Sequence, residues 1–202
     1  MERTKIQISE EELRIMQDAG IILTKNAVIE KVYQLFALLA EGYQDLSSQS
    51  IHLPVESIRV APKISRGENY KGLPYVVMDY PRYFSASSIF AIRTLFWWGH
   101  FFSISLHLRG SYRNIYGKTI LEALKAGEMG SWWLQTGSDE WQHHPQEETH
   151  LEISKIPTSN WESLFEGMEF LKLSQFIPLK QWEDAEGILL NYFDQIIQLL
   201  KN

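Results

Sequence analysis

The stretch of this chain that most constrains its fold is residues 89–109, which read IFAIRTLFWWGHFFSISLHLR. The stretch is about as long as a membrane-spanning helix, which needs roughly 20 apolar residues. However, Arg93 lies inside it and Gly99-His100 divides it. An arginine near the middle of a bilayer costs about 2.5 to 3.5 kcal/mol on insertion scales. Aromatic and β-branched residues on both sides of a glycine instead predict two antiparallel strands joined by a tight turn at Gly99-His100, and no membrane partner.

A hairpin with a two-residue loop would place Trp98 opposite Phe101 and fix which side chains share a face. One face would then carry Arg93 among apolar residues and lie on the core. Because a guanidinium keeps its charge, we expect it to be paired, with Asp79 or with a glutamate of a terminal helix. The other face mixes aromatic and polar residues, which favours either a ligand surface or a sheet face partly exposed to solvent. The ligand-binding residues expected on it are Thr94, Phe96, Trp98, Ser103, Ser105, His107 and Arg109.

The order of helical and strand-like segments is typical of a single α+β domain over residues 1–202. A capping box of Ser9 and Glu12 predicts the start of a first helix, and Gly20 is placed to end it. Apolar residues recur at helical spacing over about residues 26–40, where Gly42 offers a stop, and over about residues 181–200. Residues 57–109 are strand-like and are interrupted by prolines, which predicts a meander of four strands. Further strands are expected nearer the C-terminus. The predicted architecture is an antiparallel sheet of about five to six strands, packed by the N- and C-terminal helices.

Charge and composition exclude several classes of function. The net charge is −6 and the 19 lysines and arginines are scattered, so we expect no nucleic-acid partner. The chain has no cysteine, which excludes disulfides and a thiolate nucleophile. Its polar N-terminal segment lacks the apolar run of a secretory signal, and we expect a cytoplasmic protein. Glycine-rich phosphate loops are absent, and no cofactor is expected.

Histidines offer the remaining chemistry. His143, His144 and His150 lie in HHPQEETH beside two glutamates, and such residues can bind zinc or iron. Their spacing matches no known ligand motif, so a solvated loop competes with a metal site. A nucleophile made from Ser103 or Ser105 with His107 lacks an identified carboxylate to orient the imidazole.

Two functions remain open from the sequence. The first is a non-catalytic domain that binds a small molecule or a protein partner. The protein partner could be a second copy of the same chain. This first function is favoured by the surplus of aromatic residues, 13 per cent of the chain, and by the lack of a catalytic motif. The alternative is a metal-dependent hydrolase that uses the histidines of residues 141–150.

Overall fold

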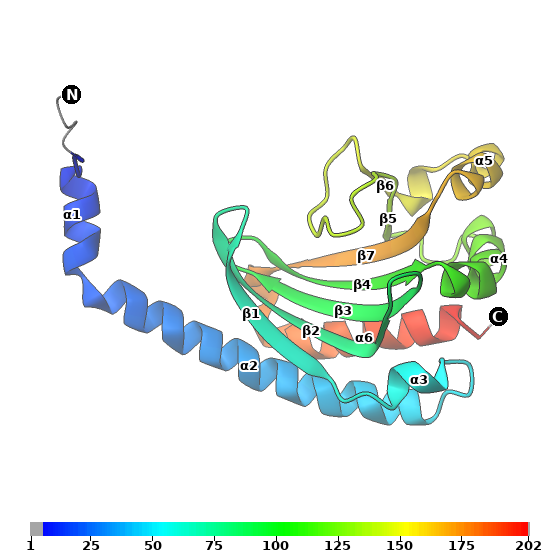
Figure 1. Cartoon of the computed structure of the whole chain (residues 1–202), viewed down its shortest axis with the longest axis horizontal. Coiled ribbons are helices and arrows are strands. Elements are labelled where there is room, and N and C mark those ends of the chain that lie inside the picture. Colours follow the sequence, from blue (N-terminus) through cyan, green and yellow to red (C-terminus); the bar gives the residue numbers. More distant parts are fainter. Residues whose placement is uncertain (1–5, 202) are drawn as a thin grey trace.

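A computed structural model of the protein describes residues 6–201, so the first five residues of the polar N-terminal segment and residue 202 lie outside the described part. One antiparallel sheet is flanked by the N- and C-terminal helices (Figure 1). The predicted α+β domain is therefore confirmed, with seven strands instead of five or six. The strands are β1 (Lys63–Tyr70), β2 (Leu73–Phe84), β3 (Ile89–Trp97), β4 (Phe101–Arg109), β5 (Trp133–Gln135), β6 (His150–Glu152) and β7 (Phe170–Pro178). The α-helices are α1 (Glu10–Gln17), α2 (Ala19–Ser48), α3 (Val55–Ile58), α4 (Ser111–Lys125), α5 (Trp161–Glu166) and α6 (Ala185–Leu199).

The strands lie in the order β1-β2-β3-β4-β7-β5-β6. The first four form the predicted meander, and β7 pairs with β4 over nine residues, from Phe101↔Pro178 to Arg109↔Phe170. Helices α2 and α6 lie side by side below the sheet in Figure 1, and the rings of Tyr43 and Phe193 stack between them at 3.9 Å. The side of the sheet that faces these helices, the helix-covered face, carries the main apolar core. Among residues 6–201, no helix is long and apolar enough to cross a bilayer.

The boundaries of the N-terminal helices differ from the prediction. Gly20 does not end the first helix, because Asp18 interrupts it and then caps α2 by accepting a hydrogen bond from the Gly20 N–H at 2.8 Å. Gly42 does not end the second helix either. A Cβ at Gly42 would lie 2.5 Å from a methyl carbon of Leu190 on α6, so this glycine allows the close approach of α2 and α6.

The hairpin between β3 and β4 has a three-residue loop, not the predicted two-residue loop. Trp97 pairs with Phe101, and Trp98, Gly99 and His100 form the turn. Gly99 has φ +76° and lies in a turn that the His100 N–H closes by donating to the Trp97 carbonyl at 3.1 Å. The Trp98 N–H donates to Pro74 on β2 at 3.0 Å, which takes Trp98 out of the β3–β4 ladder. The predicted register is therefore wrong by one residue.

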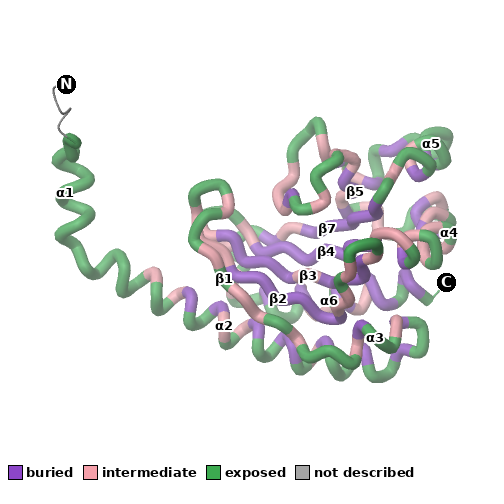
Figure 2. The backbone as a smooth tube through the Cα atoms, in the orientation of Figure 1, coloured by how far each residue is buried: buried purple, intermediate pink, exposed green. Residues whose placement is uncertain are grey.

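This shift changes which residues of the two strands share a face. Arg93 lies on the second face of the sheet, opposite the helix-covered face, together with the alternate residues of β4 that begin at Phe101. Thr94 and Phe96 lie on the helix-covered face. The central strands are buried along most of their length (Figure 2). Something other than the two long helices must therefore cover the second face.

Candidate functional site

The connection between β5 and β6, residues 136–149, covers the second face and is called the cover segment. It folds back over the sheet (Figure 1) and contacts residues from β1, β3, β4 and β7. Near the hairpin, Tyr70 of β1 holds it through two bonds at 2.7 Å: its hydroxyl bonds to His144 Nδ1 and accepts from the His143 N–H. Farther along the strands the covered residues are charged.

The structure divides the seven predicted ligand-binding residues between the two faces. Thr94 is buried under α2, where its hydroxyl lies 3.0 Å from that of Tyr43. Phe96 and Trp98 also pack with the helix-covered core. The other four, all from β4, lie on the second face: Ser103, Ser105, His107 and Arg109.

Arg93 is paired, and of the candidate partners it is Asp79 on the neighbouring strand that binds it. Its Nε and Nη2 atoms donate to the two carboxylate oxygens of Asp79 at 2.7 and 2.9 Å. The third donor, Nη1, lies 3.1 Å from Nε2 of His143. The indole of Trp141 covers the guanidinium at 5.5 Å, so two residues of the cover segment contact this ion pair.

Glu140 joins the cover segment to β4. Its Oε2 lies 3.0 Å from Nε2 of His107, and its Oε1 accepts from Arg109 at 2.6 Å. Burial is the main cause that lowers the pKa of His107 to about 3, and the positive charges of Arg93 and Arg109 lower it further. His107 is therefore neutral and donates its Nε2 proton to the carboxylate of Glu140.

Lys172, in the middle of β7, is the most unusual residue of the site because it is only 2% exposed. Its Nζ lies 2.9 Å from the Glu140 carbonyl oxygen, 2.6 Å from the Gln142 carbonyl oxygen and 3.3 Å from Nδ1 of His143. Within residues 6–201 no carboxylate forms an ion pair with it, since Asp79 and Glu140 bind the two arginines and His107. Fully buried lysines without a paired carboxylate are rare.

The hydrogen bonds around His143 indicate the charge of Lys172. A guanidinium only donates, so Nε2 of His143 accepts from Arg93 and the ring proton lies on Nδ1. That proton then points to Nζ of Lys172, which can accept it only through the lone pair of a neutral amine. The two N–H groups of such a neutral amine can then donate to the carbonyl oxygens of Glu140 and Gln142.

The pKa shifts agree with this arrangement of protons. Burial, and then the charge of Arg93, lower the pKa of Lys172 to about 7. Burial and the neighbouring cations also hold the pKa of His143 well below its usual range. Above this pKa, Lys172 and both imidazoles are neutral, and the two arginine charges are balanced by Asp79 and Glu140. These seven residues are called the buried polar cluster: Asp79, Arg93, His107, Arg109, Glu140, His143 and Lys172.

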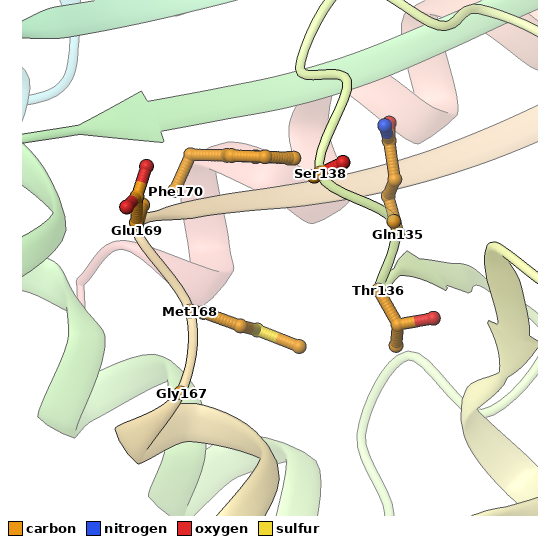
Figure 3. Close-up of a pocket in the computed structure, with 8 residues that line it drawn as sticks. Gln135, Thr136, Ser138, Gly167, Met168, Glu169 and Phe170 are labelled. Atoms are coloured by element: carbon orange, nitrogen blue, oxygen red, sulfur yellow. The ribbon is translucent and has the colours of Figure 1, made fainter.

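The cluster encloses little free space, but a larger cavity adjoins it. A void of about 10 Å³, enough for about one water molecule, lies between Arg93, Ser105, His107 and Lys172. A cavity of about 270 Å³ lies between the start of the cover segment and residues 167–170 (Figure 3). The residues that line this cavity are Gln135, Thr136, Gly137, Ser138, Gly167, Met168, Glu169 and Phe170.

Figure 3 shows Met168 projecting into the space between the two sides of this cavity. Phe170 forms part of its wall, and the Phe170 ring lies 5.8 Å from the ring of His107. The cavity and the cluster therefore share a wall. The side-chain oxygen of Gln135 is buried there without a hydrogen-bond partner among the described residues.

The three histidines of the proposed metal site do not converge. His143 contacts Arg93 and Lys172, His144 contacts Tyr70, and Nδ1 of His150 lies 3.0 Å from the Thr149 hydroxyl. Across residues 6–201, no three histidine, aspartate or glutamate side chains are grouped so that they could share a metal ion. The observed geometry therefore adds no support to the metal-dependent hydrolase.

Lys172 and Glu140 were not identified from the sequence. One signal was present, because Lys172 lies between Leu171 and Leu173 in the strand FLKLSQFIP, where the only other side chains with polar groups are the uncharged Ser174 and Gln175. A lysine in the centre of such a strand indicates a buried or ligand-facing amine. The sequence around Glu140 is that of an ordinary polar loop.

Comparisons with known protein families, with curated proteins and with solved structures found no match to this chain.

Proposed function

We propose that the protein binds a small organic acid or a similar small anion, which takes the place of the cover-segment acceptors at Lys172 in the buried polar cluster. The observation that carries this proposal is the buried Lys172, whose Nζ contacts two carbonyl oxygens and an imidazole but no carboxylate. Such an amine is a base without an anionic partner. A ligand carboxylate supplies that partner, and the ion pair forms as the amine takes up a proton.

The surroundings of Lys172 favour an anion over a neutral ligand. Arg93 and Arg109 are held in place by Asp79 and Glu140, so both can orient an anion without the cost of ordering a free side chain. The void beside Lys172 is too small for an organic acid, and the ligand must displace part of the cover segment. The adjoining 270 Å³ cavity gives room for the rest of a small molecule.

This function does not require catalysis and corresponds to the small-molecule-binding alternative favoured by the sequence. The cytoplasmic location is part of the proposal, and it is supported by the lack of cysteine, because disulfides are typical of oxidising compartments.

A thermal-shift experiment at pH 7 tests the proposal with sodium acetate, succinate, benzoate and inorganic phosphate, each compared with sodium chloride at equal ionic strength. We expect at least one salt to raise the melting midpoint of the wild type, by about 5 to 10 °C at a concentration of 100 times its Kd. Lys172→Met should lose this shift. Lys118→Met is the matched control, because that side chain is 87% exposed on α4, and it should keep the shift.

Calorimetric titration in two buffers of different ionisation enthalpy then measures the proton taken up with the ligand. No shift of the wild type with any of the four anions would refute the proposal. An equal shift of Lys172→Met would also refute it, because binding would then not involve the amine.

A further inference from the structure

The first part of the described chain projects away from the rest of the molecule. Residues 6–24, called the N-terminal arm, comprise α1 and the first turns of α2, and none of them is buried (Figures 1 and 2). The arm nevertheless carries half of the large apolar side chains that are exposed in residues 6–201. These side chains are Ile6, Ile8, Leu13, Ile15, Met16, Ile21, Ile22 and Leu23.

The apolar stripe of α2 continues into this arm. Ile29, Val32 and Phe36 recur at helical spacing and are buried against the sheet. Seven residues before Ile29, Ile22 continues the same stripe beyond the edge of the sheet, where it is 58% exposed. The helix α1 has only eight residues and no buried side chain, and helices this short are marginal in water without a partner surface.

An uncovered apolar groove lies beside the base of the arm. Its volume is about 340 Å³, and it is lined by Val28 of α2, by Phe96, Trp98 and Gly99 of the hairpin, and by Leu179 and Trp182 near the start of α6. The groove therefore lies next to the arm, and no described residue covers the groove or the apolar side chains of the arm.

We propose that the protein forms a two-fold symmetric dimer in which the arm of each copy packs into the groove of the other. A two-fold interface uses the same surface on both copies, so each chain must contribute both an apolar projection and a surface that receives it. This chain has both. Covering the eight arm side chains at roughly 60 to 100 Å² each would remove about 500 to 800 Å² from water per arm. Two arms then bury about 1,000 to 1,600 Å² before the receiving grooves are counted, which reaches the size of a stable interface.

Charge favours a second copy over a membrane surface as the partner of the arm. The arm carries Glu10, Glu11, Glu12 and Asp18 against Arg14 alone, so anionic lipids would repel it.

Light scattering coupled to size-exclusion chromatography tests this inference over a dilution series. The wild type is expected at twice the mass of one chain, and the arm variant Met16→Glu/Leu23→Glu at the mass of one chain. The arm variant should keep its melting midpoint at high dilution, because these two side chains are 71% and 66% exposed in the single chain. The matched control Ile51→Glu/Ile115→Glu changes two exposed aliphatic residues outside the arm and should remain a dimer.

Mixing variants distinguishes arm exchange from any other dimer. Leu179→Glu alters the groove and should also be monomeric, with its fold checked by circular dichroism. A mixture of the arm variant and the groove variant retains one intact arm and one intact groove per pair, and should recover a measurable fraction of dimer. A monomeric wild type, a dimeric arm variant or a mixture without recovery would overturn the proposal. A monomeric wild type that sediments with vesicles of phosphatidylcholine and phosphatidylglycerol would assign the arm to a membrane instead.

Discussion

Replacing Lys172 by methionine is expected to change how the stability of the protein depends on pH. The pKa of Lys172 falls from 10.5 to about 7 in the folded protein, chiefly because the amine is buried. At 1.36 kcal/mol per pKa unit, the folded protein disfavours the protonated amine by about 5 kcal/mol relative to the unfolded chain. The methionine side chain has a similar length and no ionisable group, so it removes the effect without leaving a large cavity.

The sign of the effect follows from the protons held by the folded and unfolded chains. Below pH 7 the amine is protonated in both states, and the whole cost of burying the ammonium lowers the free energy of unfolding. Between pH 7 and 10.5 the unfolded chain keeps a proton that the folded protein has released, so the free energy of unfolding rises with pH. Through this effect, Lys172 should raise the free energy of unfolding by about 3 kcal/mol between pH 7 and about pH 9.5.

Urea unfolding followed by tryptophan fluorescence measures this contribution. The free energy of unfolding of the wild type minus that of Lys172→Met should increase by about 3 kcal/mol over this pH range. The subtraction removes the other titrating groups that the two proteins share. Lys118→Met, at a lysine that is 87% exposed, is the control for replacing a lysine by methionine at a site without burial. Parallel curves for the wild type and Lys172→Met would show that the amine is charged in the folded protein, and would refute the assignment of protons around His143.

Two further variants test the sheet. Asp79→Asn removes the charged partner of Arg93 in a largely buried pair and is expected to lower the free energy of unfolding by about 3 to 5 kcal/mol. A loss below about 1 kcal/mol in urea unfolding would mean that the pair is effectively solvated. Gly99→Val is expected to lower the free energy of unfolding by about 1 kcal/mol or more. The cause is the backbone conformation, φ +76°, and not crowding, because a Cβ there would meet no atom within 4 Å. An unchanged melting midpoint would contradict this turn geometry.

The sequence alone determined the fold class and several of its parts. Alternating apolar residues and prolines predicted the meander, and helical spacing predicted that helices would pack on one side of it, because these patterns depend on local geometry. That Arg93 would be paired was also predicted, with Asp79 as one of the candidate partners. A guanidinium in a buried strand needs an acceptor, and Asp79 lies on the adjacent strand of the meander.

Only the tertiary structure decided which face carries the site and which residues form it. Strand alternation predicts which residues of one strand share a face, but the register between two strands depends on the loop that joins them. The loop has one residue more than predicted, and Arg93 and Thr94 each lie on the face opposite to the one predicted. The environment of Lys172 depends on a cover segment that lies about 30 residues away in the chain. Burial and the lack of a paired carboxylate together set the charge of this amine, and both are properties of the assembled neighbourhood, not of the strand that carries it.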